Sequence, residues 1–123
     1  MGPTTIWELP VPATAVEHDS PTLKFHTRRR LEIAISYRDA DDNLKSAALQ
    51  FDNVAAFKCT YLPALTTGMI TAGYGRLVDL GASEWLANTR QSPPLEVRLR
   101  HLLICFDDGP CYEFLCESFA VTE

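Results

Sequence analysis

His101 and Cys116 are the residues whose types suggest metal or nucleophile chemistry within one predicted hairpin. Pairing its strands so that Phe106 faces Cys111 places His101 opposite Cys116. A zinc site needs four ligands, or three and a water, and Cys105 lies about 13 Å further along the strand. We therefore interpret His101 as a core histidine whose ring nitrogens bond to backbone or hydroxyl groups. We predict no metal, no cofactor and no catalytic residue.

The acidic segment after residue 38 begins like a calcium-binding loop, with Asp39, Asp41 and Asn43 at alternate positions. The sixth position of such a loop is glycine and the twelfth is glutamate. Here those positions hold Leu44 and Gln50, so the segment is predicted to be a solvated turn.

Arginine and glycine motifs offer two further candidates. Arg28, Arg29 and Arg30 form the only basic cluster, which could bind an acidic partner or a phosphate, or simply solvate the start of a strand; we favour solvation. Gly73 and Gly75 lack the remaining residues of a dinucleotide or phosphate loop, and we interpret them as part of a flexible loop.

One alternative to a non-catalytic protein remains open. Four residues are expected to line a small-ligand pocket, or the site of a simple enzyme, in the cup of a curved sheet: Tyr61, Trp85, His101 and Tyr112.

Alternating hydrophobic residues predict the strands that would form this sheet. Leu31, Ile33, Ile35 and Tyr37 share one face, as in a strand with one buried side. The returning strand is predicted over 45–51 and a third over 54–62, while 64–75 is rich in threonine and glycine.

A single short helix is predicted over 83–90, where Ser83 is a suitable N-cap and Trp85 and Leu86 would be buried. The clearest element is a C-terminal hairpin at about 96–120, whose strands are joined by a turn containing Asp108-Gly109. Its predicted register turns Leu99, Leu103 and Phe114 into the core. The expected fold class is α+β, mostly one antiparallel curved sheet.

The first 22 residues differ from the rest because they hold four of the eight prolines together with several hydrophobic residues. We expect an extended strap over 1–22 and a single α+β domain over 23–123. The strap would cross this domain or a second copy of the chain, which predicts a homodimer formed through the strap.

Composition narrows the class of protein. The chain has 123 residues, 46% of them hydrophobic, and a formal net charge of −5, which argues against binding nucleic acid across a broad surface. The sequence shows no membrane span and no secretory signal. The four cysteines are expected to be reduced thiols, and the protein to be cytoplasmic.

Three segments carry a resemblance: 75–81, Ser83-Glu84-Trp85-Leu86, and 100–109 with the Tyr112-Glu113 and Glu117-Ser118-Phe119 that end it. They are similar to small uncharacterised bacterial β-rich proteins, and more weakly to immunity proteins that neutralise polymorphic toxins. The resemblance implies a binding role and no catalytic residue. The predicted function is a non-catalytic intracellular protein-binding module, an immunity-type inhibitor being its narrower form.

Overall fold

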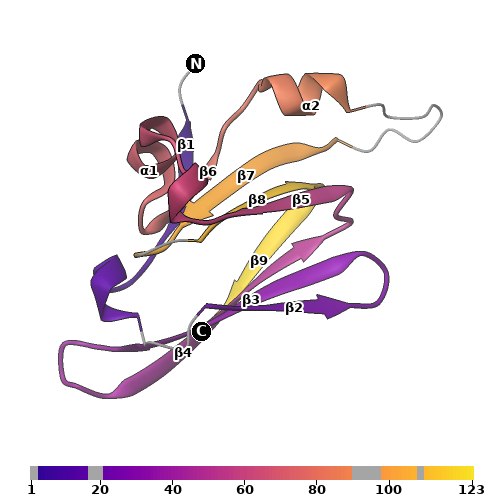
Figure 1. Ribbon diagram of the computed structural model, residues 1–123. Coiled ribbons are helices and arrows are strands. Elements are labelled where there is room, and N and C mark those ends of the chain that lie inside the picture. The colour runs from indigo at the N-terminus through magenta and orange to yellow at the C-terminus, as the bar shows by residue number, and fades with distance from the viewer. Residues whose placement is uncertain (1–2, 17–20, 90–97, 108–109) are drawn as a thin grey trace.

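The computed structural model describes residues 3–16, 21–89, 98–107 and 110–123. They form antiparallel sheets with two short α-helices, so the predicted α+β, β-rich class is confirmed. The strands form two sheets rather than the single curved one expected (Figure 1). In spatial order, the five-stranded sheet contains β1 (Thr4–Glu8), β6 (Arg76–Asp79), β7 (Arg100–Cys105), β8 (Cys111–Cys116) and β5 (Ala56–Thr60). The four-stranded sheet contains β2 (Thr22–His26), β3 (Arg30–Arg38), β4 (Leu44–Asp52) and β9 (Ser118–Thr122).

The four-stranded sheet contains the predicted hairpin of β3 and β4. Leu31, Ile33, Ile35 and Tyr37 are buried on one face of β3, as their alternation predicted. The last strand, β9, was not expected, because 111–120 was interpreted as one continuous strand. The chain instead bends between β8 and β9 and crosses from one sheet to the other.

The main hydrophobic core lies between the two sheets. At its centre the rings of Phe51 from β4 and Phe114 from β8 stack with centroids 3.9 Å apart. Both side chains are fully buried, and burying a phenylalanine side chain stabilises a fold by about 1.5–3 kcal/mol. This packing fixes the faces that the two sheets turn toward each other.

The C-terminal hairpin forms with a register one residue away from the prediction. Cys105, not Phe106, faces Cys111, and Leu102, not Leu103, faces Phe114. Leu103 is buried in a hydrophobic core, as predicted, but on the face of the sheet opposite to Phe114, in a second cluster beneath the first helix. Both faces of β7 are buried, so hydrophobicity could not select the register.

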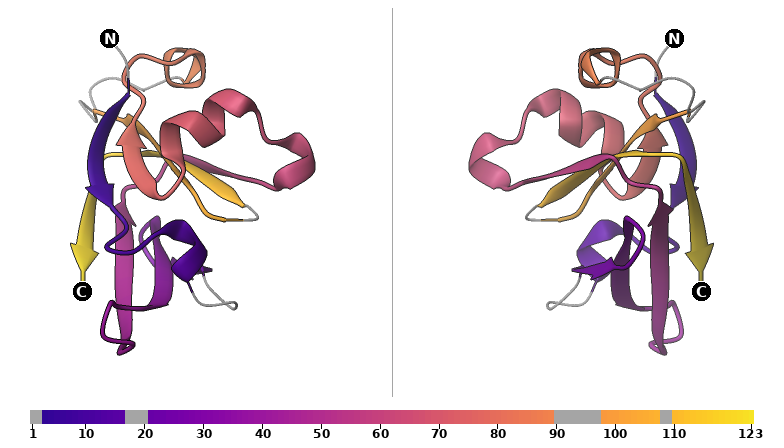
Figure 2. Two further views of the ribbon diagram at one scale, coloured as in Figure 1. Left: turned by 90° about the vertical axis from the view of Figure 1, so that its left-hand side faces the viewer. Right: turned by 90° about the vertical axis from the view of Figure 1, so that its right-hand side faces the viewer.

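Two α-helices lie in the described chain. The first, α1 (Thr67–Gly73), is capped by Thr66, whose side chain accepts a hydrogen bond from Met69 N at 3.1 Å. The prediction of a flexible loop containing Gly73 is therefore wrong at this residue, because Gly73 belongs to α1. Gly73 packs closely on β7, where an added Cβ would lie 3.0 Å from Leu103 Cγ. In both views of Figure 2, α1 projects from one side of the molecule.

The second helix, α2 (Glu84–Asn88), confirms the prediction of a short helix near 83–90. Its N-cap is Ser83, as expected, and the side-chain oxygen accepts a hydrogen bond from Leu86 N at 3.1 Å. Trp85 and Leu86 are half-buried rather than buried. Figure 1 shows α2 above the five-stranded sheet, on the side away from the four-stranded sheet.

The predicted N-terminal strap lies against its own chain in the described residues 3–16. Its strand β1 pairs with β6 at one edge of the five-stranded sheet. Leu9 and Ala13 then enter the core between the sheets, and Leu9 N donates to Gly75 O at 3.0 Å. The division of the chain at residue 22 stays a prediction.

Two of the four cysteines form a disulfide, Cys105–Cys111. The expectation of four reduced thiols is wrong for this pair, because the actual register sets the two residues directly opposite each other. Cys59 is free and exposed, and Cys116 is free and buried. Burial raises the pKa of the Cys116 thiol to about 12.

Candidate functional site

The four residues predicted to line one pocket fall on opposite faces of the five-stranded sheet. His101 lies on the outer face of β7, where Trp85 of α2 packs against it with ring centroids 5.1 Å apart. Tyr112 of β8 points to the inner face, between Phe106 and Phe114. Tyr61, just after β5, is exposed. The sheet itself therefore separates the pair Trp85 and His101 from Tyr112.

On the outer face, His101 joins α2 to the sheet through hydrogen bonds at both ring nitrogens. Its Nδ1 lies 2.7 Å from Ser83 Oγ, and its Nε2 lies 2.9 Å from Glu113 Oε1 on β8. His101 is 5% exposed. Since Leu86 N donates to Ser83 Oγ, the serine hydroxyl can donate to Nδ1 while Nε2–H donates to the carboxylate. This assignment follows from the hydrogen-bond network.

A serine, a histidine and a carboxylate are also the groups of a hydrolytic triad. Here, however, Ser83 already caps α2. The ring of His101 is also turned the other way, because Nδ1 faces the serine and Nε2 faces the carboxylate, whereas in a triad Nε2 faces the serine. Trp85 packs over the imidazole, and Lys58 Nζ of β5 lies 4.0 Å from the centre of the Trp85 ring. We therefore assign Ser83, His101 and Glu113 a structural role, holding α2 on the sheet.

On the inner face, Tyr112 lies close to Cys59 and Tyr61. Burial raises the pKa of Tyr112 to about 12, with smaller contributions from the neighbouring Cys59 and Tyr61. A hydrogen bond with Cys59 raises the pKa of Tyr61. Both phenols are thus neutral near pH 7. They act as aromatic surface with a hydroxyl group and not as bases.

Three exposed aromatic side chains lie on or just after the edge strands β2 and β5. We call these residues, Phe25, Phe57 and Tyr61, the aromatic edge. Their exposed fractions are 65%, 40% and 64%. Phe25 pairs with Leu31 and Phe57 with Phe114, so both rings lie on the inner faces of their sheets. Their centroids are 5.5 Å apart. The aromatic edge therefore continues the core to the open side between β2 and β5, which are outer strands of their sheets.

A basic turn follows the strand that carries Phe25, although the chain as a whole is acidic. The turn between β2 and β3 contributes the arginine cluster 28–30. Lys24 and Lys58 are neighbours of Phe25 and Phe57 in the strands but lie on the opposite faces of the sheets. Lys24 Nζ lies 3.9 Å from Glu32, and Lys58 Nζ lies over the Trp85 ring on the outer face.

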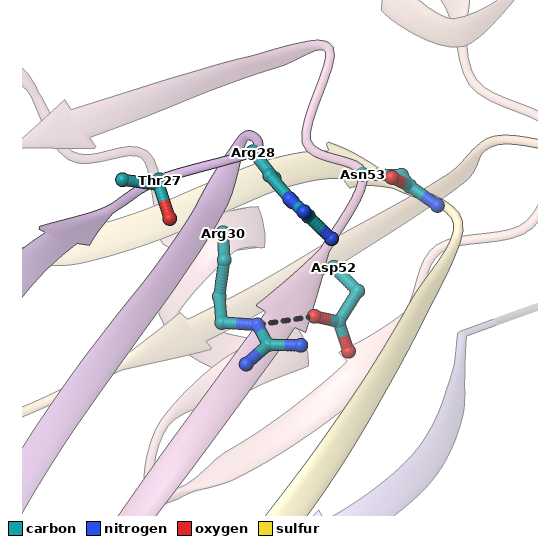
Figure 3. Close-up of a pocket in the computed structure, with 5 residues that line it drawn as sticks. All are labelled: Thr27, Arg28, Arg30, Asp52 and Asn53. Atoms are coloured by element: carbon teal, nitrogen blue, oxygen red, sulfur yellow. Dashed lines mark hydrogen bonds and ion pairs between the residues drawn. The ribbon is translucent and has the colours of Figure 1, made fainter.

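The arginine cluster also forms part of a pocket with a volume of about 540 Å³ (Figure 3). Thr27, Arg28 and Arg30 line it from the turn before β3, and Asp52 and Asn53 line it from the end of β4. Arg30 Nε donates to Asp52 Oδ1 at 2.7 Å. The sequence singled out the arginines, but the contribution of Asp52 and Asn53 depends on the pairing of β3 with β4.

Comparison with known proteins gives no assignment. No family model matches the chain, and no match was found among curated proteins or solved structures. The resemblance to immunity-type proteins therefore stays a prediction. Among the described residues, no group of three or more His, Cys, Asp or Glu side chains could hold a metal ion. In the same part of the chain, no helix is long and apolar enough to cross a membrane.

Sequence reasoning did not find the aromatic edge. Phe25 precedes the first predicted strand, and Phe57 lies in the strand predicted over 54–62, for which no exposed face was predicted. Their exposure depends on both strands lying at the outside of different sheets, which no local pattern encodes. Glu113 was also missed as a partner of His101, because the predicted register placed the two residues on different faces.

Proposed function

We propose that this chain is a non-catalytic protein-binding module whose partner docks on the aromatic edge. The observation that carries the proposal is the contact of Phe25 and Phe57, two exposed rings from different sheets. Exposing such rings to water is unfavourable, and clustered apolar surface of this kind is typical of interaction sites.

The partner surface we propose is an acidic protein segment. The arginine cluster 28–30 follows β2, the strand that carries Phe25, so a partner with carboxylates beside apolar side chains would match this surface in charge. The outer strands β2 and β5 also expose backbone groups to which an extended segment can add as a further strand. Backbone pairing would provide affinity, and the aromatic edge would provide specificity.

A second copy of the chain matches this surface less well. In a symmetric dimer the same patch lies on both sides of the interface, so two arginine clusters of like charge would be brought into one interface. The predicted homodimer through the strap is a separate hypothesis. Light scattering coupled to size-exclusion chromatography tests it.

The narrower hypothesis is an immunity-type inhibitor that acts inside the cell. It predicts that the bound partner is a toxin whose activity falls on binding. The cytoplasmic location stays a prediction as well, and the Cys105–Cys111 disulfide weighs against it, because such bonds are uncommon in a reducing cytoplasm.

The experiment compares capture of a stoichiometric partner by the wild-type protein and by the Phe25→Ser, Phe57→Ser double variant. Leu44→Ser is the matched control, because Leu44 is 61% exposed at the far end of β4. We expect the double variant to lose the partner and the control to retain it. Equal capture by all three proteins, or capture by none, contradicts the proposal. Circular dichroism verifies that the variants are folded.

A further inference from the structure

The pocket beneath the turn that joins β2 and β3 has the chemistry of an anion site. Arg28 has no hydrogen-bond or ion-pair partner among the described residues. Figure 3 shows its side chain extending over the pocket toward the ion pair of Arg30 and Asp52. Two guanidinium groups therefore approach the same space, and that of Arg28 has no partner within the described ranges of the chain.

Asp52 positions Arg30 without using all of its donors. The carboxylate accepts from Arg30 Nε at 2.7 Å, and a guanidinium has further N–H groups on its two terminal nitrogens. Asp52 removes one unit of positive charge, so the pocket keeps a net charge of about +1 from the two arginines and the aspartate. The remaining lining residues add a hydroxyl from Thr27 and an amide from Asn53. The Asn53 Nδ2 group donates at 2.6 Å to Oε2 of Glu117, a residue that does not line the pocket.

The turn that brings these groups together is tight. Arg28, Arg29 and Asn53 have φ angles of 61°, 58° and 53°. Positive φ at consecutive residues is the geometry that tight β-hairpin turns require, and asparagine adopts it more readily than most residues. The pairing of β2 with β3 therefore fixes the backbone at Arg28, whose side chain extends over the pocket.

We propose that this pocket binds a phosphate group. A phosphate monoester carries about two negative charges near pH 7 and presents three acceptor oxygens. The Arg28 guanidinium, the remaining donors of Arg30 and the Thr27 hydroxyl are three donor groups from one short segment. The volume of about 540 Å³ accommodates a phosphate and part of the molecule that carries it. The site shares Arg28 and Arg30 with the partner surface proposed above, but a titration with phosphate alone tests it without any protein partner.

The test is a titration with inorganic phosphate, followed through the backbone amide signals of residues 27–30 and 52–53 by NMR. We expect saturable shifts in wild type and binding at least about tenfold weaker in Arg28→Gln, which loses charge-assisted hydrogen bonds. The control is Arg38→Gln, an exposed arginine at the other end of β3, which should bind like wild type. Arg30→Gln is the second variant if Arg28→Gln does not fold.

Three results would overturn the proposal. They are the absence of saturable shifts, equal weakening by Arg28→Gln and Arg38→Gln, and equal affinity for acetate and phosphate. A phosphoserine peptide and a sugar phosphate, titrated in parallel, distinguish the source of the group. Tighter binding of the peptide indicates a phosphorylated protein, and tighter binding of the sugar phosphate indicates a small molecule.

Discussion

Removing the Glu113 side chain tests the structural role assigned to the hydrogen bonds around His101. In Glu113→Ala, Nε2–H of a histidine that is 5% exposed loses its only described partner. An unsatisfied buried polar group costs about 1–3 kcal/mol. The variant should therefore lose about 1–3 kcal/mol of unfolding free energy, because His101 stays buried without an acceptor.

The expected change in melting temperature follows from the length of the chain. At about 2.1 cal/mol/K per residue, unfolding 123 residues has an entropy of about 0.26 kcal/mol/K. A loss of 1 kcal/mol then lowers the melting temperature by about 4 °C, so Glu113→Ala should melt about 4–12 °C below wild type. Calorimetry measures the temperature, and urea unfolding measures the free energy independently.

Two variants control for effects other than the hydrogen bond. Glu113→Gln keeps an acceptor oxygen and should retain most of the stability. Glu117→Ala removes an exposed glutamate that accepts from Asn53 Nδ2 at 2.6 Å, and should cost less than Glu113→Ala. If Glu113→Ala melts within 2 °C of wild type, or no lower than Glu117→Ala, the structural role of the network is refuted.

Three further predictions concern the cysteines and Tyr112. The Cys105–Cys111 disulfide closes a short loop with a sequence separation of 6. Its reduction should lower the unfolding free energy by about 2 kcal/mol. Urea unfolding with and without reductant measures the difference, and an unchanged free energy would contradict the prediction. Iodoacetamide should modify exposed Cys59 in the native protein but not buried Cys116, whose pKa is raised to about 12; mass spectrometry of the native and unfolded protein would detect any early labelling of Cys116. Burial raises the pKa of Tyr112 from 10 to about 12. The stability that the neutral phenol contributes is therefore complete below pH 10 and is lost as the pH rises through 12. Tyr112→Phe should show a smaller decline in melting temperature across that pH range than wild type.

The sequence predicted the elements whose pattern is local. Alternation from Leu31 to Tyr37 identified the buried face of β3, because one face of this strand is buried and the other is partly exposed to solvent. Ser83 was recognised as an N-cap because capping depends on residue type over one helical turn. These features need no knowledge of what packs against them.

Features that depend on tertiary pairing were not predictable in the same way. The register of β7 and β8 was wrong by one residue because both faces of β7 are buried, by the second sheet on one side and by α1 on the other. That error hid the Cys105–Cys111 disulfide and the contact of His101 with Glu113. The arginines were visible as a cluster, but the pocket requires Asp52 and Asn53 from another strand end.

Site-specific photo-crosslinking in the source organism tests the proposed function most directly. A benzoylphenylalanine placed at position 57 reports on the aromatic edge, and the same residue at exposed position 44 reports on a remote surface. We predict that position 57 crosslinks to one protein of a defined mass and that position 44 does not. No crosslinked species at position 57, or the same species from both positions, would contradict a partner bound between β2 and β5.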